Sequence, residues 1–132
     1  MREAYRRVRF EKAAFVHDFS DPKKLWLFSR VLPYTMVSYA ALANVYELAQ
    51  KAEKEKLKGA FVECGVWRGG AAGTMARVAE DAESGRQIWL FDSFEGLPEP
   101  SKEDGARAAE YSATKSSGKL VSIEKCVGPL KD

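Results

Sequence analysis

The sequence predicts an α/β fold in which helices alternate with short parallel strands. Two apolar runs, at residues 60–64 and 87–92, are short and bounded by turn residues, as buried strands are. An alanine-rich helical pattern separates the two runs, and a longer helical pattern precedes the first. The order helix, strand, helix, strand implies parallel pairing with a right-handed crossover.

Size and composition limit the possible functions. The 132 residues fit one domain, which is short for a complete doubly wound sheet. Hydrophobic residues make up 45% and charged residues 30% of the chain, the balance of a globular protein. A net charge of +2, spread along the chain, predicts no nucleic-acid partner. No apolar stretch reaches the roughly 18 residues of a membrane span and no secretory signal is recognisable, so we expect a cytoplasmic protein without a membrane partner.

The N-terminal part is expected to be helical. Residues 2–18 mix basic with aromatic and apolar side chains, which is typical of an irregular amphipathic helix packed on the domain or on a partner subunit. Ser-Asp-Pro at 20–22 predicts a helix start, and Pro33 interrupts the segment that follows. Ser38 is placed to cap the next helix, whose apolar residues recur at helical spacing until a charged stretch.

The chain divides on this interpretation at residue 58. Residues 1–58 form the helical region with the first core helix, and residues 59–132 form the N-terminal part of a Rossmann-like domain. Residues 96–105 are rich in proline, glycine and charge and are expected to form a loop. Residues 120–123 suggest one more short strand, so the sheet is expected to be incomplete.

The strongest functional signal lies in residues 61–70. An apolar run meets Glu63 and breaks into a turn that contains Gly65, Gly69 and Gly70. Glycines in such a turn allow the backbone to approach a ligand closely, because a side chain would occupy the ligand's volume. The glycine spacing fits neither GxGxxG nor GxxxxGK[ST], so triphosphate binding is not expected.

Two carboxylates favour a cationic cofactor at this turn. Glu63 would repel a pyrophosphate but can hold an ammonium group through charge-assisted hydrogen bonds. Asp92 ends the next strand, where a Rossmann-type fold binds ribose hydroxyls. S-adenosylmethionine has a sulfonium, an ammonium, a ribose and a carboxylate that suits the N–H groups at a helix start. The sequence therefore points to S-adenosylmethionine.

Three segments resemble the macrocin O-methyltransferase family. They read Glu-Cys-Gly-Val-Trp-Arg-Gly-Gly at 63–70, Trp-Leu-Phe-Asp-Ser-Phe-Glu-Gly-Leu-Pro at 89–98 and Pro-Tyr-Thr-Met-Val-Ser at 33–38. The resemblance covers residues 32–100 and implies the N-terminal part of a class I methyltransferase fold, a doubly wound parallel sheet with preceding helices. It also implies S-adenosylmethionine, help from Mg²⁺, and a small-molecule acceptor with a sugar hydroxyl.

The resemblance further implies which residues contact the cofactor. Glu63 and Gly65 would face its methionine portion, and Asp92 would hold its ribose. The other implied contacts are Trp67 and Arg68 in the turn, Gly69 where the cofactor enters, Ser93 and Phe94 beside the adenosine, and Thr35, Met36 and Ser38 on the N-terminal side. Trp67 as a core residue, Arg68 as an ion-pair partner and Ser38 as a helix cap are equally open. The family's metal ligands and catalytic base lie in later strands, so none is assigned here.

Two other functions stay open. A non-catalytic oligomerisation or partner-binding module fits an incomplete sheet, whose apolar edge needs a cover such as a homo-oligomer. An NAD-binding domain is disfavoured by Glu63 and by the missing GxGxxG. Cys64 and Cys126 lack the spacing of a zinc site, and His17 has no nucleophile motif near it, so no metal or nucleophilic centre is expected.

Overall fold

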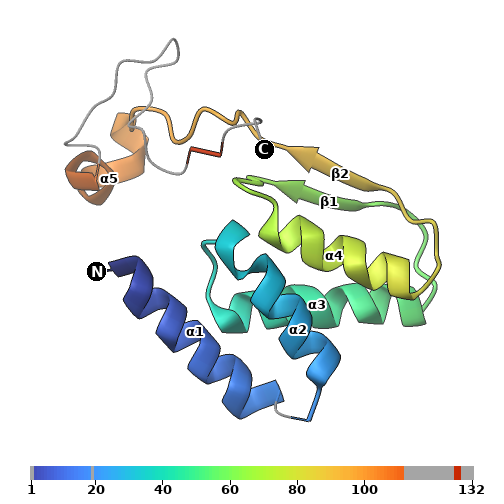
Figure 1. The fold of residues 1–132 in the computed structure, drawn as a ribbon. Helices are drawn as coiled ribbons and strands as arrows, with labels where there is room; N and C mark the ends of the chain where they lie inside the picture. Colours follow the sequence, from blue (N-terminus) through green and yellow to red (C-terminus); the bar gives the residue numbers. More distant parts are fainter. Residues whose placement is uncertain (1, 19, 112–126, 129–132) are drawn as a thin grey trace. The chain divides into compact units, whose positions relative to one another are not determined.

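The computed structural model describes residues 2–18, 20–111 and 127–128 (Figure 1). The chain forms two compact units, Met1–Phe91 and Asp92–Asp132, which are treated separately below. The first unit contains α1 (Arg2–Asp18), α2 (Pro22–Val31), the 3₁₀ helix η1 (Leu32–Tyr34), α3 (Tyr39–Lys54), β1 (Phe61–Cys64), α4 (Gly70–Asp81) and β2 (Ile88–Phe91). The second contains the 3₁₀ helix η2 (Lys102–Asp104) and α5 (Gly105–Tyr111). The molecule is therefore a mixed α/β protein.

Side-chain caps set the starts of two helices. The Asp21 carboxylate accepts a hydrogen bond from the backbone N–H of Lys24 at 3.0 Å, at the start of α2. The Ser38 hydroxyl accepts one from the N–H of Ala41 at 3.3 Å, at the start of α3. Each cap satisfies an N–H group that has no partner within its own helix. Both predicted helix starts are confirmed, and Pro33 lies in η1, directly after α2 ends.

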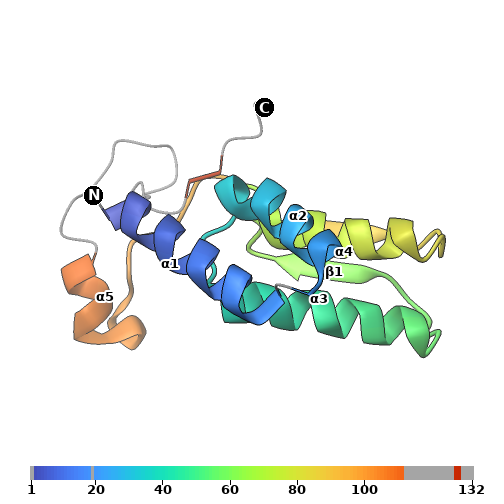
Figure 2. The same cartoon turned by 60° about the horizontal axis from the view of Figure 1, so that its bottom comes forward.

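The core of the first unit lies between its helices. Phe28 and Leu42 have no exposed surface, and Phe10 is 4% exposed. The ring of Phe28 makes edge-to-face contacts with the rings of Phe10, Tyr39 and Tyr46 at centroid distances of 5.9 to 6.0 Å. Such aromatic contacts add stability beyond the buried area. They join α1, α2 and α3, and Figure 2 shows α1 running alongside the other two helices.

β1 and β2 form a parallel pair, with Phe61 opposite Ile88 and Cys64 opposite Phe91. The intervening helix α4 packs on both strands and on α3, so both helices lie on the same side of the strands (Figure 1). The predicted parallel pairing is confirmed, and each strand lies within the predicted range. Four apolar strand residues stay about half exposed, namely Val62, Trp89, Leu90 and Phe91.

Arg86 fastens the connections at the amino ends of the strands. Its guanidinium donates to the Glu53 carboxylate at 2.5 Å and to the carbonyls of Gly59 and Leu57, each at 2.7 Å. It also lies 4.7 Å from the centroid of the Phe61 ring. The hydrogen bond from Arg86 lowers the pKa of Glu53, and the same bond raises the pKa of Arg86. Arg86, two residues before β2, thus links the α3–β1 connection to the α4–β2 connection.

The second unit begins with turns and short helices. Ser101 and Asp104 form a capping box, in which the Asp104 carboxylate accepts from the Ser101 N–H at 2.7 Å and from its hydroxyl at 2.8 Å. The expectation of an irregular loop over residues 96–105 is therefore wrong at its end, because this box starts η2 and α5 follows. The strand expected at 120–123 lies outside the described residues. The division of the chain at residue 58 stays a prediction; residue 58 lies within the first unit.

No helix in the described part of the chain is long and apolar enough to cross a membrane.

Candidate functional site

The glycine-rich turn follows β1 directly and reaches the end of β2. The Gly65 N–H donates to the carbonyl of Phe91 at 2.8 Å, so the first glycine lies against the last residue of the neighbouring strand. Gly65 and Gly69 have φ angles of 86° and 81°, which side chains rarely tolerate. Gly69 is also the N-cap of α4, and its carbonyl accepts from the Gly73 N–H at 2.7 Å. The turn thus ends at the start of α4.

The glycines of the turn have two different roles. A Cβ atom added at Gly65 or Gly69 would meet nothing within 4 Å, so both border open space. A Cβ at Gly70 would lie 2.6 Å from the Cβ of Thr35 and 2.7 Å from the carbonyl oxygen of Tyr34. We expected all three glycines to make room for a ligand. Gly70 instead makes room for the chain segment before α3.

Glu63 places a carboxylate at the start of this turn. The residue is half-buried in β1, opposite Leu90, and its Oε2 atom is buried. A buried carboxylate is costly unless positive or hydrogen-bonding groups surround it.

Trp67 and Arg68 form the outer part of the turn. Trp67 is half-buried and has a positive φ of 52°, an uncommon conformation for a bulky residue. The Arg68 guanidinium lies 5.0 Å from the centroid of the Trp67 ring, within the range of a cation–π contact. Backbone strain of this kind costs on the order of 1–3 kcal/mol and clusters at functional sites.

The segment before α3 reaches the turn through Thr35. Thr35 is 4% exposed, and its hydroxyl accepts from the Val37 N–H at 3.3 Å. The structure therefore brings Thr35 together with the start of α4, whereas Met36 is 43% exposed. Ser38 is the N-cap of α3, which confirms the structural role that we considered for it.

Asp92, Ser93 and Phe94 open the second unit. Asp92 comes directly after Phe91, the last residue of β2. Its Oδ1 atom accepts from the Phe94 N–H at 2.8 Å, and the Ser93 hydroxyl accepts from the Glu95 N–H at 3.3 Å. These local bonds are typical of Asx and Ser turns, and Phe94 has a positive φ of 58°.

Among the residues that the structure describes, no group of three or more His, Cys, Asp or Glu side chains is arranged to hold a metal ion.

The geometry defines an α/β protein in which a parallel strand, a glycine-rich turn and a helix start form one continuous unit. The model of the family described as macrocin O-methyltransferase matches residues 9–127 of this chain. The chain therefore belongs to the macrocin O-methyltransferase family, and the resemblance found in its sequence is confirmed.

Three relatives are O-methyltransferases by name. The 8-demethyl-8-(2,3-dimethoxy-alpha-L-rhamnosyl)-tetracenomycin-C 4'-O-methyltransferase of Streptomyces olivaceus is 35% identical over 64% of this chain and 34% of its own length. Demethyldecarbamoylnovobiocin O-methyltransferase of Streptomyces niveus is 36% identical over 54% of this chain and 28% of its own length. Mycinamicin III 3''-O-methyltransferase of Micromonospora griseorubida is 31% identical over 75% and 38%. The matched part of the chain thus spans about a third of the length of these relatives.

Proposed function

We propose that the protein is an S-adenosylmethionine-dependent O-methyltransferase and that this chain supplies the methyl-donor side of its site. The observation that carries the proposal is the open space beside Gly65 and Gly69, next to the paired ends of β1 and β2. Membership of the family and the names of the three relatives support it. The Rossmann-like class I fold is part of the proposal, and the parallel pair joined by α4 supports it.

The residues of the turn suit S-adenosylmethionine, which when bound supplies a methyl group on a positive sulfonium. Glu63 would hold the ammonium of its methionine portion, and the N–H groups at the start of α4 would receive its carboxylate. Gly65 and Gly69, which have no side chains, would leave space for the cofactor beside the turn. Asp92 would bind the ribose hydroxyls. The remaining proposed contacts are Trp67 and Arg68 in the turn, Ser93 and Phe94 after β2, and Thr35, Met36 and Ser38 before α3.

The acceptor in this proposal is a sugar hydroxyl on a small molecule. The family resemblance supports it, and the name of the Streptomyces olivaceus relative includes a rhamnosyl group. The chain's part in the transfer is to hold the donor in a fixed orientation, which raises the rate by positioning. A homo-oligomer is also proposed, because the half-exposed apolar residues of the strands would be covered in one. The comparisons give no support to a non-catalytic module.

Calorimetry with S-adenosylhomocysteine tests the donor site directly. We expect one binding site, and we expect Asp92→Ala to weaken binding about tenfold or more, since it removes charge-assisted hydrogen bonds to ribose. Asp81→Ala, at the far end of α4 from the turn, is the control and should keep the affinity. Absence of binding, or equal affinities for the Asp92 and Asp81 variants, would refute the proposal. Titration with NAD should give no heat.

A further inference from the structure

Thr74, near the start of α4, carries a hydroxyl group in the core. Its side chain is 0% exposed, and the hydroxyl donates a hydrogen bond to the Gly70 carbonyl at 2.9 Å. The other buried side chains that the structure describes in α4 are apolar, namely Ala72, Val78 and Ala79. In an α-helix the carbonyl of residue 70 already accepts from the N–H of residue 74. The hydroxyl of Thr74 is therefore a second donor to this carbonyl, in a place that water does not reach.

Stability alone does not favour a hydroxyl at this position. Burying a hydroxyl costs free energy, which a single hydrogen bond offsets only approximately. Valine has nearly the same shape as threonine, and it would leave the Gly70 carbonyl its partner within the helix. A threonine that bonds to the carbonyl four residues earlier also slightly destabilises a helix and often bends it. The hydrogen bond of Thr74 thus points to a role in placing Gly70.

A second contact limits the position of Gly70. A Cβ atom added there would lie 2.6 Å from the Cβ of Thr35 and 2.7 Å from the carbonyl oxygen of Tyr34, so residues 34–35 leave no room for a side chain. Thr35 is itself 4% exposed. The start of α4 cannot move toward this segment, and the hydroxyl of Thr74 holds the Gly70 carbonyl within the helix. Together the two contacts fix the first peptide groups of α4.

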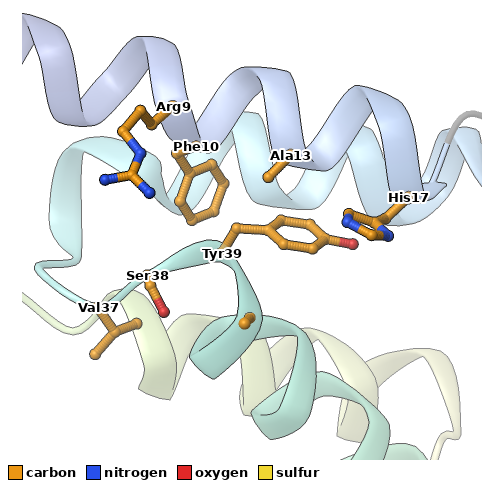
Figure 3. A pocket seen from close by; sticks show the side chains of 8 residues that line it. Arg9, Phe10, Ala13, His17, Val37, Ser38 and Tyr39 are labelled. Carbon is orange, nitrogen blue, oxygen red and sulfur yellow. The ribbon is translucent and has the colours of Figure 1, made fainter.

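The segment that contacts Gly70 is anchored to α1 at its other end. Figure 3 shows Tyr39 beside Phe10 and His17 of α1, and the ring centroids lie 5.8 and 5.5 Å apart, respectively. These three residues help to line a cavity of about 500 Å³ between α1 and the start of α3. The segment from Thr35 to Tyr39 is therefore held at both ends, which makes it a firm support for the start of α4.

The first peptide groups of α4 are those that would meet the cofactor. The first N–H groups of a helix have no partner within the helix. Gly69 is the N-cap of α4, and a Cβ atom added to it would meet nothing within 4 Å. In the proposed function these N–H groups receive the carboxylate of the methionine portion. A hydrogen bond weakens steeply as its angle departs from a straight line. A small rotation of the first turn would therefore lower the affinity for that carboxylate.

We propose that Thr74 is a positioning residue of the donor site. Its hydroxyl acts through the Gly70 carbonyl and sets the direction of the N–H groups that receive the cofactor's carboxylate. Thr74 has no exposed surface and so does not touch the cofactor itself. This inference rests on the proposed function, and it adds a residue that lies outside the glycine-rich turn.

Two substitutions at Thr74 separate positioning from stability. Thr74→Val removes the hydroxyl and should leave the urea midpoint unchanged or higher, yet weaken binding of S-adenosylhomocysteine about fivefold. Thr74→Ser keeps the hydroxyl but loses a buried methyl group, so it should lower the midpoint and still bind within about twofold of the wild type. Calorimetry and urea denaturation of the whole protein measure both quantities. Losses of affinity that follow the losses of stability would overturn the proposal.

A shorter ligand identifies the part of the cofactor that depends on Thr74. Methylthioadenosine has the ribose and the sulfur but neither the carboxylate nor the ammonium group. Thr74→Val should therefore leave its affinity unchanged while weakening S-adenosylhomocysteine. Asp92→Ala is the matched control and should weaken both ligands, since both contain the ribose. Equal losses of affinity for the two ligands in Thr74→Val would overturn the role in placing the carboxylate.

The wild-type protein separates this inference from the proposed function. If S-adenosylhomocysteine does not bind to the wild type, the proposed function fails, and the role of Thr74 fails with it. If the ligand binds, is weakened by Asp92→Ala and binds equally well to Thr74→Val, the donor site stands and only the role of Thr74 is overturned.

Discussion

Similar apolar side chains are buried in the helices of the first unit but about half exposed in its strands. Phe28 in α2 is 0% exposed and contacts three other rings, whereas Phe91 in β2 is 54% exposed. Leu42 in α3 is 0% exposed, and Leu90 is 46% exposed. Burial of apolar surface is the main stabilising term in folding. The helices therefore hold this unit together, while the strands mainly place the glycine-rich turn.

The largest effect is expected from removing a ring of the helical core. Phe28→Ala should lower the free energy of unfolding by about 3–5 kcal/mol, the cost of deleting a buried phenylalanine. Phe91→Ala removes the same group from the strand pair and should cost much less. Urea denaturation of both variants measures the difference. Similar losses would show that the strands contribute as much stability as the helices do.

The next effect concerns the contact between the start of α4 and the segment before α3. Gly70→Ala should destabilise the protein by about 3 kcal/mol, since its Cβ would overlap Thr35 and the Tyr34 backbone. Gly73→Ala is the matched control, because its Cβ would meet Val31 Cγ1 at 3.6 Å, an ordinary contact. Alanine is favoured over glycine inside a helix by about 0.5–1 kcal/mol, so the control should raise the melting temperature. Thermal unfolding measures both melting temperatures. A shift of both in the same direction would contradict this account.

A smaller effect should distinguish a buried valine of α4 from a half-exposed valine of β1. Val78 in α4 is 5% exposed and Val62 in β1 is 56% exposed. Val78→Thr puts a hydroxyl in the core and should cost about 1 kcal/mol, while Val62→Thr should stay within about 0.5 kcal/mol of zero. Chemical denaturation resolves the two values. A larger loss for Val62→Thr would mean that a covering group is present on that residue.

The smallest effect should depend on pH. The pKa of Glu53 is lowered in the folded protein by the hydrogen bond from Arg86, so the pair stabilises the fold above the ordinary glutamate pKa and loses this contribution as pH falls through the lowered value. Glu53→Gln should therefore lower the melting temperature most at neutral pH and least in acid. Glu55→Gln, which removes a carboxylate 3.9 Å from an exposed lysine, is the control variant. A pH-independent difference for Glu53→Gln would contradict the assignment.

The parts of the fold that the sequence predicts are those set by local signals. Hydrophobic periodicity locates α3 and both strands, and the caps Asp21 and Ser38 depend on side chains within one turn of the helix. The site is also predictable where local signals set it. Gly65 and Gly69 predict a turn with positive φ angles, which the structure has.

What the sequence does not predict depends on residues that are distant along the chain. The contact of Gly70 with Thr35 joins segments on either side of α3, and the Arg86–Glu53 pair joins two separate connections. The cavity lined by residues of α1 and of the start of α3 likewise needs these two helices to lie side by side. Periodicity and spacing carry no information about such pairings, because each partner alone looks like an ordinary surface residue.

The close approach at Gly70 has a mechanical consequence. Atoms already in contact cannot be compressed further, so the start of α4 and residues 34–35 must be displaced together. A ligand that pulls on the turn would therefore also pull on the segment that leads into α3. Occupation of the turn should be felt as slower hydrogen exchange at Ala41 and Leu42, the first backbone amides of α3 that bond to Ser38.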